Sequence, residues 1–75
     1  MTIGEAIKKA RKSRGLKQNQ LAKAMGVHAY QISLWETGRG FPHILNCLSL
    51  ADVLNVSLDE LVGRSVKGGV DKDKG

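Results

Sequence analysis

A small all-α domain is the fold class that this sequence predicts, and three observations support it. Seventy-five residues suffice for one domain with a small core, and the hydrophobic share of 41% is ordinary for a globular protein. Apolar residues recur at helical intervals in several segments, and no strand-like alternation is visible. Glycine, asparagine and proline residues stand between those segments, where helices end.

The first predicted helix spans Ile3 to Arg14. Thr2 and Glu5 have the spacing of a capping box, in which each side chain accepts a hydrogen bond from the backbone N–H of the other residue. Apolar residues then follow at intervals of three and four. Gly15 ends this helix.

The segment from Gln18 to Thr37 has the pattern of two short helices joined by a three-residue turn. We expect helices at 18–25 and 29–37, with Gly26 in the left-handed conformation that ends the first of them. Where two such helices contact each other or the core, the residues are apolar or small: Leu21, Ala22, Met25, Val27, Ile32 and Trp35. This spacing predicts a helix-turn-helix, a motif that binds DNA.

Two more helices are expected after a short loop. Gly38 ends the third helix, Pro42 keeps the loop irregular, and a helix at 44–54 follows, which Asn55 ends because asparagine tolerates the left-handed conformation. A second capping box, at residues 57 and 60, opens a short helix that ends at Gly63. We therefore expect one domain over residues 1–63 and a flexible tail over 64–75, which is too polar and glycine-rich to pack.

The net charge of +5 is unevenly distributed along the chain. Residues 1–40 contain eight basic and two acidic residues, a net charge of +6, whereas residues 41–75 contain four basic and five acidic residues, a net charge of −1. A positive field around the motif suits a polyanion, since each phosphate that is neutralised releases counterions. The plainer alternative is that the basic run at residues 8–14 is a solvated helix face.

The order GLKQNQLAKAMGV, QISLWETG, a proline, and LSLADVLNVSLDELVG resembles the phage-repressor and Cro-type (XRE-like) helix-turn-helix family over about residues 3–63. The resemblance implies a compact, five-helix, lambda-repressor-like domain whose second and third helices form the motif. It also implies that the third helix enters the major groove of double-stranded DNA. Members of the family usually bind a palindromic operator as homodimers.

The outward face of the third helix carries no charge, which suits base edges better than a solvated surface. Its residues match the base-contacting positions of the family: Ala29, Tyr30, Ser33 and Leu34. Where the family often places Gln, Asn or Arg, this chain offers mainly apolar contacts, so the DNA sequence that it prefers is not evident. We expect the shape of the DNA to contribute more to recognition than usual. The alternative for Tyr30 is packing over the second helix.

Six residues around the motif are candidate phosphate contacts: Lys17, Gln18, Asn19, His28, Gln31 and Arg39. The first three open the second helix, where unpaired N–H groups and the helix dipole favour an anion. In the family, the glutamine that matches Gln18 contacts the DNA backbone and braces the third helix. Each of three residues has an alternative to a phosphate contact. Lys17 would be only a weak helix cap, His28 an N-cap residue and Arg39 a surface side chain without a partner.

The resemblance further implies an ion pair between Arg11 and Glu36, which match paired positions of phage repressors. Such a pair holds the first helix to the third and turns the Arg11 guanidinium toward a phosphate. The contribution of this ion pair to stability depends on its burial, since an exposed pair contributes little.

Four apolar residues form a candidate dimer interface: Leu45, Leu48, Val62 and Val66. Leu45 is unusual because the matching family position is usually polar. Core packing and scattered surface residues are the alternatives. Two copies joined in this region would present their third helices one turn of DNA apart, ~34 Å.

Cys47 falls on the inward face of the fourth helix, so we expect a buried thiol rather than a redox switch. With one cysteine, and with His28 and His43 apart in sequence, there is no zinc-site spacing, and no cofactor is expected. The chain shows neither paired carboxylates nor a nucleophile beside a base, so an enzyme is not expected.

The sequence therefore favours a cytoplasmic transcriptional regulator, a repressor, that binds double-stranded DNA as a homodimer. No apolar run approaches the ~18 residues of a membrane span, and the N-terminus begins an amphipathic helix without a signal-like block. Two alternatives involve a protein partner. In the first, the chain is the antitoxin of a toxin–antitoxin pair and also represses its own operon. In the second, it is an adaptor that bridges regulators without recognising a DNA sequence.

Overall fold

The computed structural model describes residues 2–61 as an all-helical fold. Its helices are α1 (Ile3–Ser13), α2 (Gln18–Met25), α3 (Ala29–Thr37) and α4 (Ile44–Leu54), and a fifth helical segment runs from residue 58 to the end of the described part. No strand occurs in this range. The all-α prediction is confirmed, and Val62, the expected helix end at Gly63 and the expected tail at 64–75 lie outside the described residues.

Local signals fix the helix ends close to the predicted positions. The Thr2 hydroxyl accepts a hydrogen bond from the Glu5 N–H at 3.1 Å, and the Glu5 carboxylate accepts one from the Thr2 N–H at 2.9 Å. Helix α1 ends one residue earlier than expected, because Arg14 has φ −92° and ψ 0° and acts as its C-cap. Asn55 ends α4 with φ +57°, as predicted.

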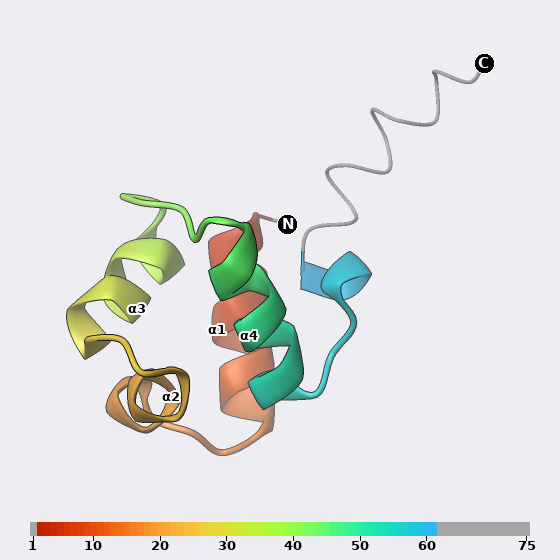
Figure 1. The fold of residues 1–75 in the computed structure, drawn as a ribbon, viewed down its shortest axis with the longest axis horizontal. Helices are drawn as coiled ribbons and strands as arrows, with labels where there is room; N and C mark the ends of the chain where they lie inside the picture. The colour runs from red at the N-terminus through yellow and green to blue at the C-terminus, as the bar shows by residue number, and fades with distance from the viewer. Residues whose placement is uncertain (1, 62–75) are drawn as a thin grey trace.

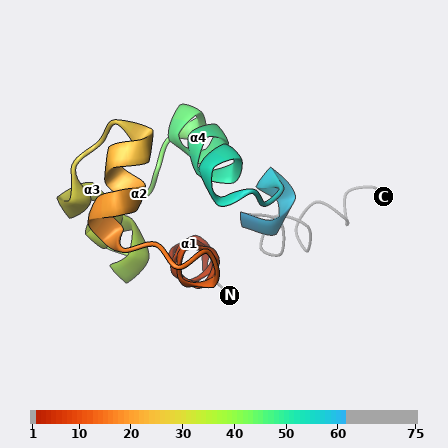
Figure 2. The same cartoon turned by 90° about the horizontal axis from the view of Figure 1, so that it is seen from below.

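The helices pack in pairs around one core. Helix α3 packs against α1 and α2, and α4 packs against α2 and α1 (Figure 1). Seen nearly along α1, the α2–α3 pair lies to the upper left of α1, α4 lies above it and the 58–61 segment lies to the right (Figure 2). Each element supplies a side chain to the buried cluster, whose fully buried members are Ile7, Leu21, Ile32, Leu50 and Leu54.

Cys47 is buried beside this core, as the sequence predicted. Its Sγ donates a hydrogen bond to the Pro42 carbonyl oxygen at 3.6 Å, which joins α4 to the loop before it. Burial removes water that would solvate the thiolate, so the pKa of the Cys47 thiol is raised above its ordinary value.

Gly4 allows α1 to lie directly on the last turn of α3. A Cβ at this position would collide with the carbonyl oxygen of Trp35 and would lie 2.9 Å from the carbonyl oxygen of Glu36. These are backbone atoms, which cannot rotate away as a flexible side chain would. A residue without a side chain is therefore required at this crossing.

We expect Gly4→Ala to destabilise the domain by about 1–3 kcal/mol, because overpacking at a backbone contact forces the two helices apart. Helix propensity alone predicts the opposite sign, since alanine favours a helix by about 0.5–1 kcal/mol over glycine. Urea denaturation measures the difference. Gly40→Ala is a matched control, because its Cβ would meet Leu34 at an ordinary 3.6 Å. A Gly4→Ala variant as stable as the parent would contradict the crossing described above.

The raised pKa and the burial of Cys47 predict that its thiol reacts slowly with alkylating reagents. Alkylation by iodoacetamide requires the thiolate, and at pH 8 the folded chain should hold less of it than a free cysteine. We expect the folded protein to react at least about tenfold more slowly than the chain unfolded in urea. Equal rates in the two states would show that the thiol is accessible.

Candidate nucleic-acid interface

Gly26 sets the direction of the turn between α2 and α3. It has φ +76° and ends α2, and its N–H bonds back to the carbonyl oxygens of Ala22 and Lys23. The next N–H, of Val27, also donates to the Ala22 carbonyl oxygen at 3.0 Å. The predicted turn is present, and three residues separate the end of α2 at Met25 from the start of α3 at Ala29.

Helix α3 has one buried side and one exposed side. Ile32 and Trp35, three residues apart on the helix, are buried in the core and anchor it. Tyr30 is 72% exposed, and its neighbour Gln31 is also exposed. Tyr30 therefore projects away from the body of the domain, and the alternative of packing over the second helix does not apply.

The four candidate base contacts differ in how far they project. Ser33 and Leu34 are half-buried, and Ala29 is half-buried and packs against the core cluster. Leu34 is partly covered because the turn after α3 lies against it: the N–H groups of Arg39 and Gly40 donate to its carbonyl oxygen at 2.9 and 3.2 Å. Tyr30 is thus the most accessible side chain of the set.

Basic and polar side chains stand at the ends of α2 and α3 in the chain. Lys17, Asn19, His28 and Arg39 are exposed, whereas Gln18 is half-buried. Lysine has no acceptor for an N-cap bond, so only half of a capping box forms at α2, in which the Gln20 Oε1 accepts from the Lys17 N–H at 2.8 Å. The first turn of α2 carries no acidic residue.

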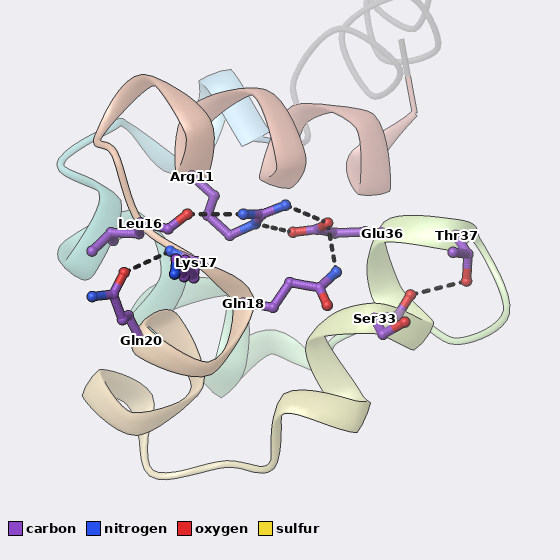
Figure 3. Close-up of polar contacts among 8 residues, drawn as sticks. All are labelled: Arg11, Leu16, Lys17, Gln18, Gln20, Ser33, Glu36 and Thr37. Carbon is purple, nitrogen blue, oxygen red and sulfur yellow. Dashed lines mark hydrogen bonds and ion pairs between the residues drawn. The ribbon is translucent and has the colours of Figure 1, made fainter.

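His28 precedes α3 as its N-cap residue, but its side chain makes no capping hydrogen bond. At the other end of α3, the Thr37 hydroxyl donates to the Ser33 carbonyl oxygen at 2.9 Å (Figure 3). Both His28 and Arg39, at opposite ends of the helix, remain exposed.

A buried ion pair fixes α3 to the rest of the domain. The Arg11 Nε donates to the Glu36 Oε2 at 2.7 Å, and the Arg11 Nη2 donates to Oε1 at 3.1 Å, so the pair is bidentate (Figure 3). The two side chains are only 9% and 3% exposed. The third guanidinium nitrogen, Nη1, donates to the Leu16 carbonyl oxygen at 2.8 Å, and Gln18 Nε2 donates to Glu36 Oε1 at 3.0 Å. Four elements meet here: α1, the loop after it, α2 and α3.

The network leaves the positive charge of residues 2–40 largely unneutralised. Glu36 pairs with the buried Arg11, and the carboxylate of Glu5 accepts from the backbone at the start of α1. These are the two acidic residues of this part of the chain. The basic residues that remain are all exposed: Lys8, Lys9, Lys12, Arg14, Lys17, Lys23 and Arg39.

Two of the four candidate dimer residues fall in the described part, and both Leu45 and Leu48 are exposed on α4. Val62 and Val66 lie outside the described residues. The sequence pattern placed Ile44 on the buried face of this helix with Cys47 and Leu50, but Ile44, at the first turn of α4, is exposed, and so is Phe41 in the loop before it.

Two absences hold for residues 2–61. The structure contains no group of three or more His, Cys, Asp or Glu residues that could hold a metal ion. None of its helices there has the length and apolar character to cross a membrane.

The chain is similar to known proteins over most of its length. A family model described as helix-turn-helix matches residues 7–61. The chain is 36% identical over 64 residues to the cryptic phage CTXphi transcriptional repressor RstR of Vibrio cholerae, covering 85% of this chain and 57% of that protein. It is 32% identical over 62 residues to the HTH-type transcriptional activator BcrR of Enterococcus faecalis, covering 83% of this chain and 30% of that one. It thus spans about half or less of these relatives.

Among solved structures, the fold matches the P22 c2 repressor in complex with a synthetic operator, with a TM-score of 0.79 and 35% identity. The match covers 83% of this chain and 94% of that one. The topology and the position of the two central helices are therefore shared with a repressor whose structure was solved on DNA.

Breaking the buried pair should be costly, since it leaves an uncompensated charge in the interior. We expect Arg11→Met and Glu36→Gln each to destabilise the domain by about 3–5 kcal/mol. The double variant should lose less than the two single losses combined, by about 1–3 kcal/mol, because neither charge is then left alone. Urea denaturation of all four proteins measures this coupling.

Glu5→Gln is the matched control, because Glu5 is exposed and glutamine can still accept the Thr2 N–H. It should change the free energy of unfolding by less than about 1 kcal/mol. Additive losses in the double variant would show that Arg11 and Glu36 do not depend on each other.

Proposed function

This chain belongs to the phage-repressor (XRE-type) helix-turn-helix family, and from that premise we propose that it is a sequence-specific, double-stranded-DNA-binding transcriptional repressor. The observation that carries the proposal is the exposed side of α3. Ile32 and Trp35 anchor the helix and Tyr30 projects from it, while exposed Lys17 precedes α2 and exposed Arg39 follows α3. A major groove admits an α-helix, and its phosphates lie where these basic residues would meet them.

Tyr30 is the principal base contact in this proposal. Its ring can lie against the methyl group of a thymine, and its hydroxyl can exchange a hydrogen bond with a base edge or a phosphate. Ser33 and Leu34 also contact bases in this proposal, but they extend less far from the domain than Tyr30, since both are half-buried. Ala29, which packs against the core, can offer its methyl group alone.

The phosphate contacts are assigned to side chains that the structure leaves exposed or at the first turn of α2. Lys17, Gln18 and Asn19 surround the unpaired N–H groups of that turn, and Arg39 follows α3. His28 and Gln31 are exposed at the edge of α3. We do not extend the assignment to Arg11, because all three of its nitrogens already donate within the protein and its side chain is buried.

Repression is proposed over activation on two grounds. The relative at 36% identity and the P22 protein are both named repressors, whereas one relative is named an activator. A domain that occupies the major groove also excludes other proteins from the same DNA without further parts. We propose that two copies act together on an inverted repeat, in the cytoplasm, where the operator lies. The relatives named above are transcription regulators, and we propose no catalytic role.

Selection of binding sites from random duplexes at physiological salt tests the proposal. The parent protein should recover a preferred site with two-fold symmetry. Tyr30→Ala should change the bases preferred at one position in each half-site, because it removes a base contact. Arg39→Ala should weaken all sites alike and lower the slope of log affinity against log salt by about one unit, because it removes a phosphate contact.

The two variants control for each other, since both truncate an exposed side chain on or beside α3. Recovery of no preferred site by the parent protein would refute sequence-specific binding. Unchanged preferences in Tyr30→Ala would refute the base-contact assignment while leaving the rest of the proposal in place.

A further inference from the structure

Helix α3 has no side chain that recognises a base through its charge. Its one charged residue is Glu36, whose side chain is 3% exposed and paired with Arg11. The exposed residues of the helix are Tyr30, Gln31 and Thr37, and none of them is charged. Arginine and lysine, which most often recognise guanine, do not occur in this helix. A strong preference for guanine therefore has no source on α3.

The polar groups at and beside Tyr30 can act either as donors or as acceptors. The hydroxyls of Tyr30 and Ser33 do both, and the Gln31 amide carries a donor and an acceptor. Each can therefore pair with the amino group of adenine or cytosine, or with the carbonyl oxygen of guanine or thymine. Thr37 differs, because its hydroxyl already donates to the Ser33 carbonyl oxygen at 2.9 Å (Figure 3). It lies at the other end of α3, about 10 Å along the helix from Tyr30.

Apolar surface supplies the selectivity that these polar groups do not. The Tyr30 side chain is 72% exposed, and Leu34, four residues further on, is a half-buried neighbour on the same side of the helix. In the major groove, the group that an apolar surface recognises is the 5-methyl group of thymine. Uracil and unmodified cytosine lack this methyl group, whereas 5-methylcytosine carries it on the same ring atom as thymine. Such a surface distinguishes methylated from unmethylated pyrimidines more than it distinguishes thymine from cytosine.

We propose that α3 recognises the 5-methyl group of a pyrimidine, so that 5-methylcytosine takes the place of thymine at one position of each half-site. The inference rests on the proposed function, in which Tyr30 contacts a base, and it names the chemical group that this contact requires. It also makes binding depend on the methylation of the DNA. Methylation of a cytosine at that position raises the affinity, and removal of the methyl group from a thymine lowers it.

The size of the effect follows from the burial of one methyl group. Moving a methyl group from water to an apolar contact corresponds to about a fourfold change in affinity. The same factor applies to thymine against uracil and to 5-methylcytosine against cytosine, because each pair of bases differs by this one group. Equal factors in the two comparisons therefore distinguish recognition of the methyl group from recognition of the rest of the base.

Substitution of single bases in the duplex obtained by site selection tests the inference. Uracil replaces each thymine in turn, which removes the methyl group and nothing else. We expect about fourfold weaker binding for uracil at one position of each half-site. At that position, a duplex with 5-methylcytosine should bind more tightly than one with cytosine by the same factor. Titrations followed by fluorescence anisotropy at one salt concentration give all the affinities.

Two variants of Tyr30 show whether this side chain carries the effect. Tyr30→Phe keeps the ring and loses the hydroxyl, so both methyl effects should remain, whereas Tyr30→Ala should lose both. Circular dichroism verifies that each variant folds.

Three results would each overturn the inference: no single uracil weakens binding, 5-methylcytosine binds no better than cytosine, or both effects persist in Tyr30→Ala. A preferred site that is insensitive to methyl groups overturns the inference alone. If the parent protein selects no preferred site, the proposed function itself fails, and the inference fails with it.

Discussion

The buried pair of Arg11 and Glu36 is the interaction on which the rest of the structure depends. Helix α3 has nine residues, too few to be stable alone, and its orientation comes from what holds it. Apolar contacts of Ile32 and Trp35 fix its depth in the core, but such contacts are not directional. The bidentate pair is directional, and because Gln18 and the Leu16 carbonyl oxygen complete its hydrogen bonds, it fixes α3 relative to α1 and α2 together. A small domain with a limited core gains a defined interface in this way.

That arrangement also explains the composition of the exposed side of α3. Glu36 lies on the same helix as Tyr30, yet its charge is matched by Arg11 and buried, so it does not oppose a nearby anion. The exposed residues of α3 are uncharged, and exposed basic residues precede α2 and follow α3. With one strongly projecting side chain, Tyr30, discrimination among bases would come from fit against the groove more than from paired hydrogen bonds. In the proposed function, sequence preference therefore depends mainly on the aromatic ring of Tyr30.

Much of the fold follows from local sequence, and the remainder depends on distant contacts. Helix boundaries were predictable because caps and left-handed residues such as Thr2, Gly26 and Asn55 act within a few residues of the helix ends. The resemblance to phage repressors supplied the Arg11–Glu36 pair, since no local rule links residues 25 apart. The need for glycine at position 4 arises from a backbone crossing between α1 and α3, which no local pattern reveals. For the same reason, the sequence placed Ala29 on the outward face with Tyr30, whereas Ala29 packs against the core and only Tyr30 of the two projects.

The distribution of charge along the chain connects the proposed DNA contact with the proposed contact between copies. A short domain that binds DNA needs a positive surface, and that surface opposes association of two copies in solution. Within the described residues, the basic side chains all precede residue 40 and residues 40–51 are uncharged, which separates the two requirements within one fold. The phosphates of a shared operator would neutralise the basic surfaces of both copies at once and so remove the repulsion between them. Association of two copies would then be favoured on a shared operator over free solution, because DNA removes the charge repulsion that opposes it.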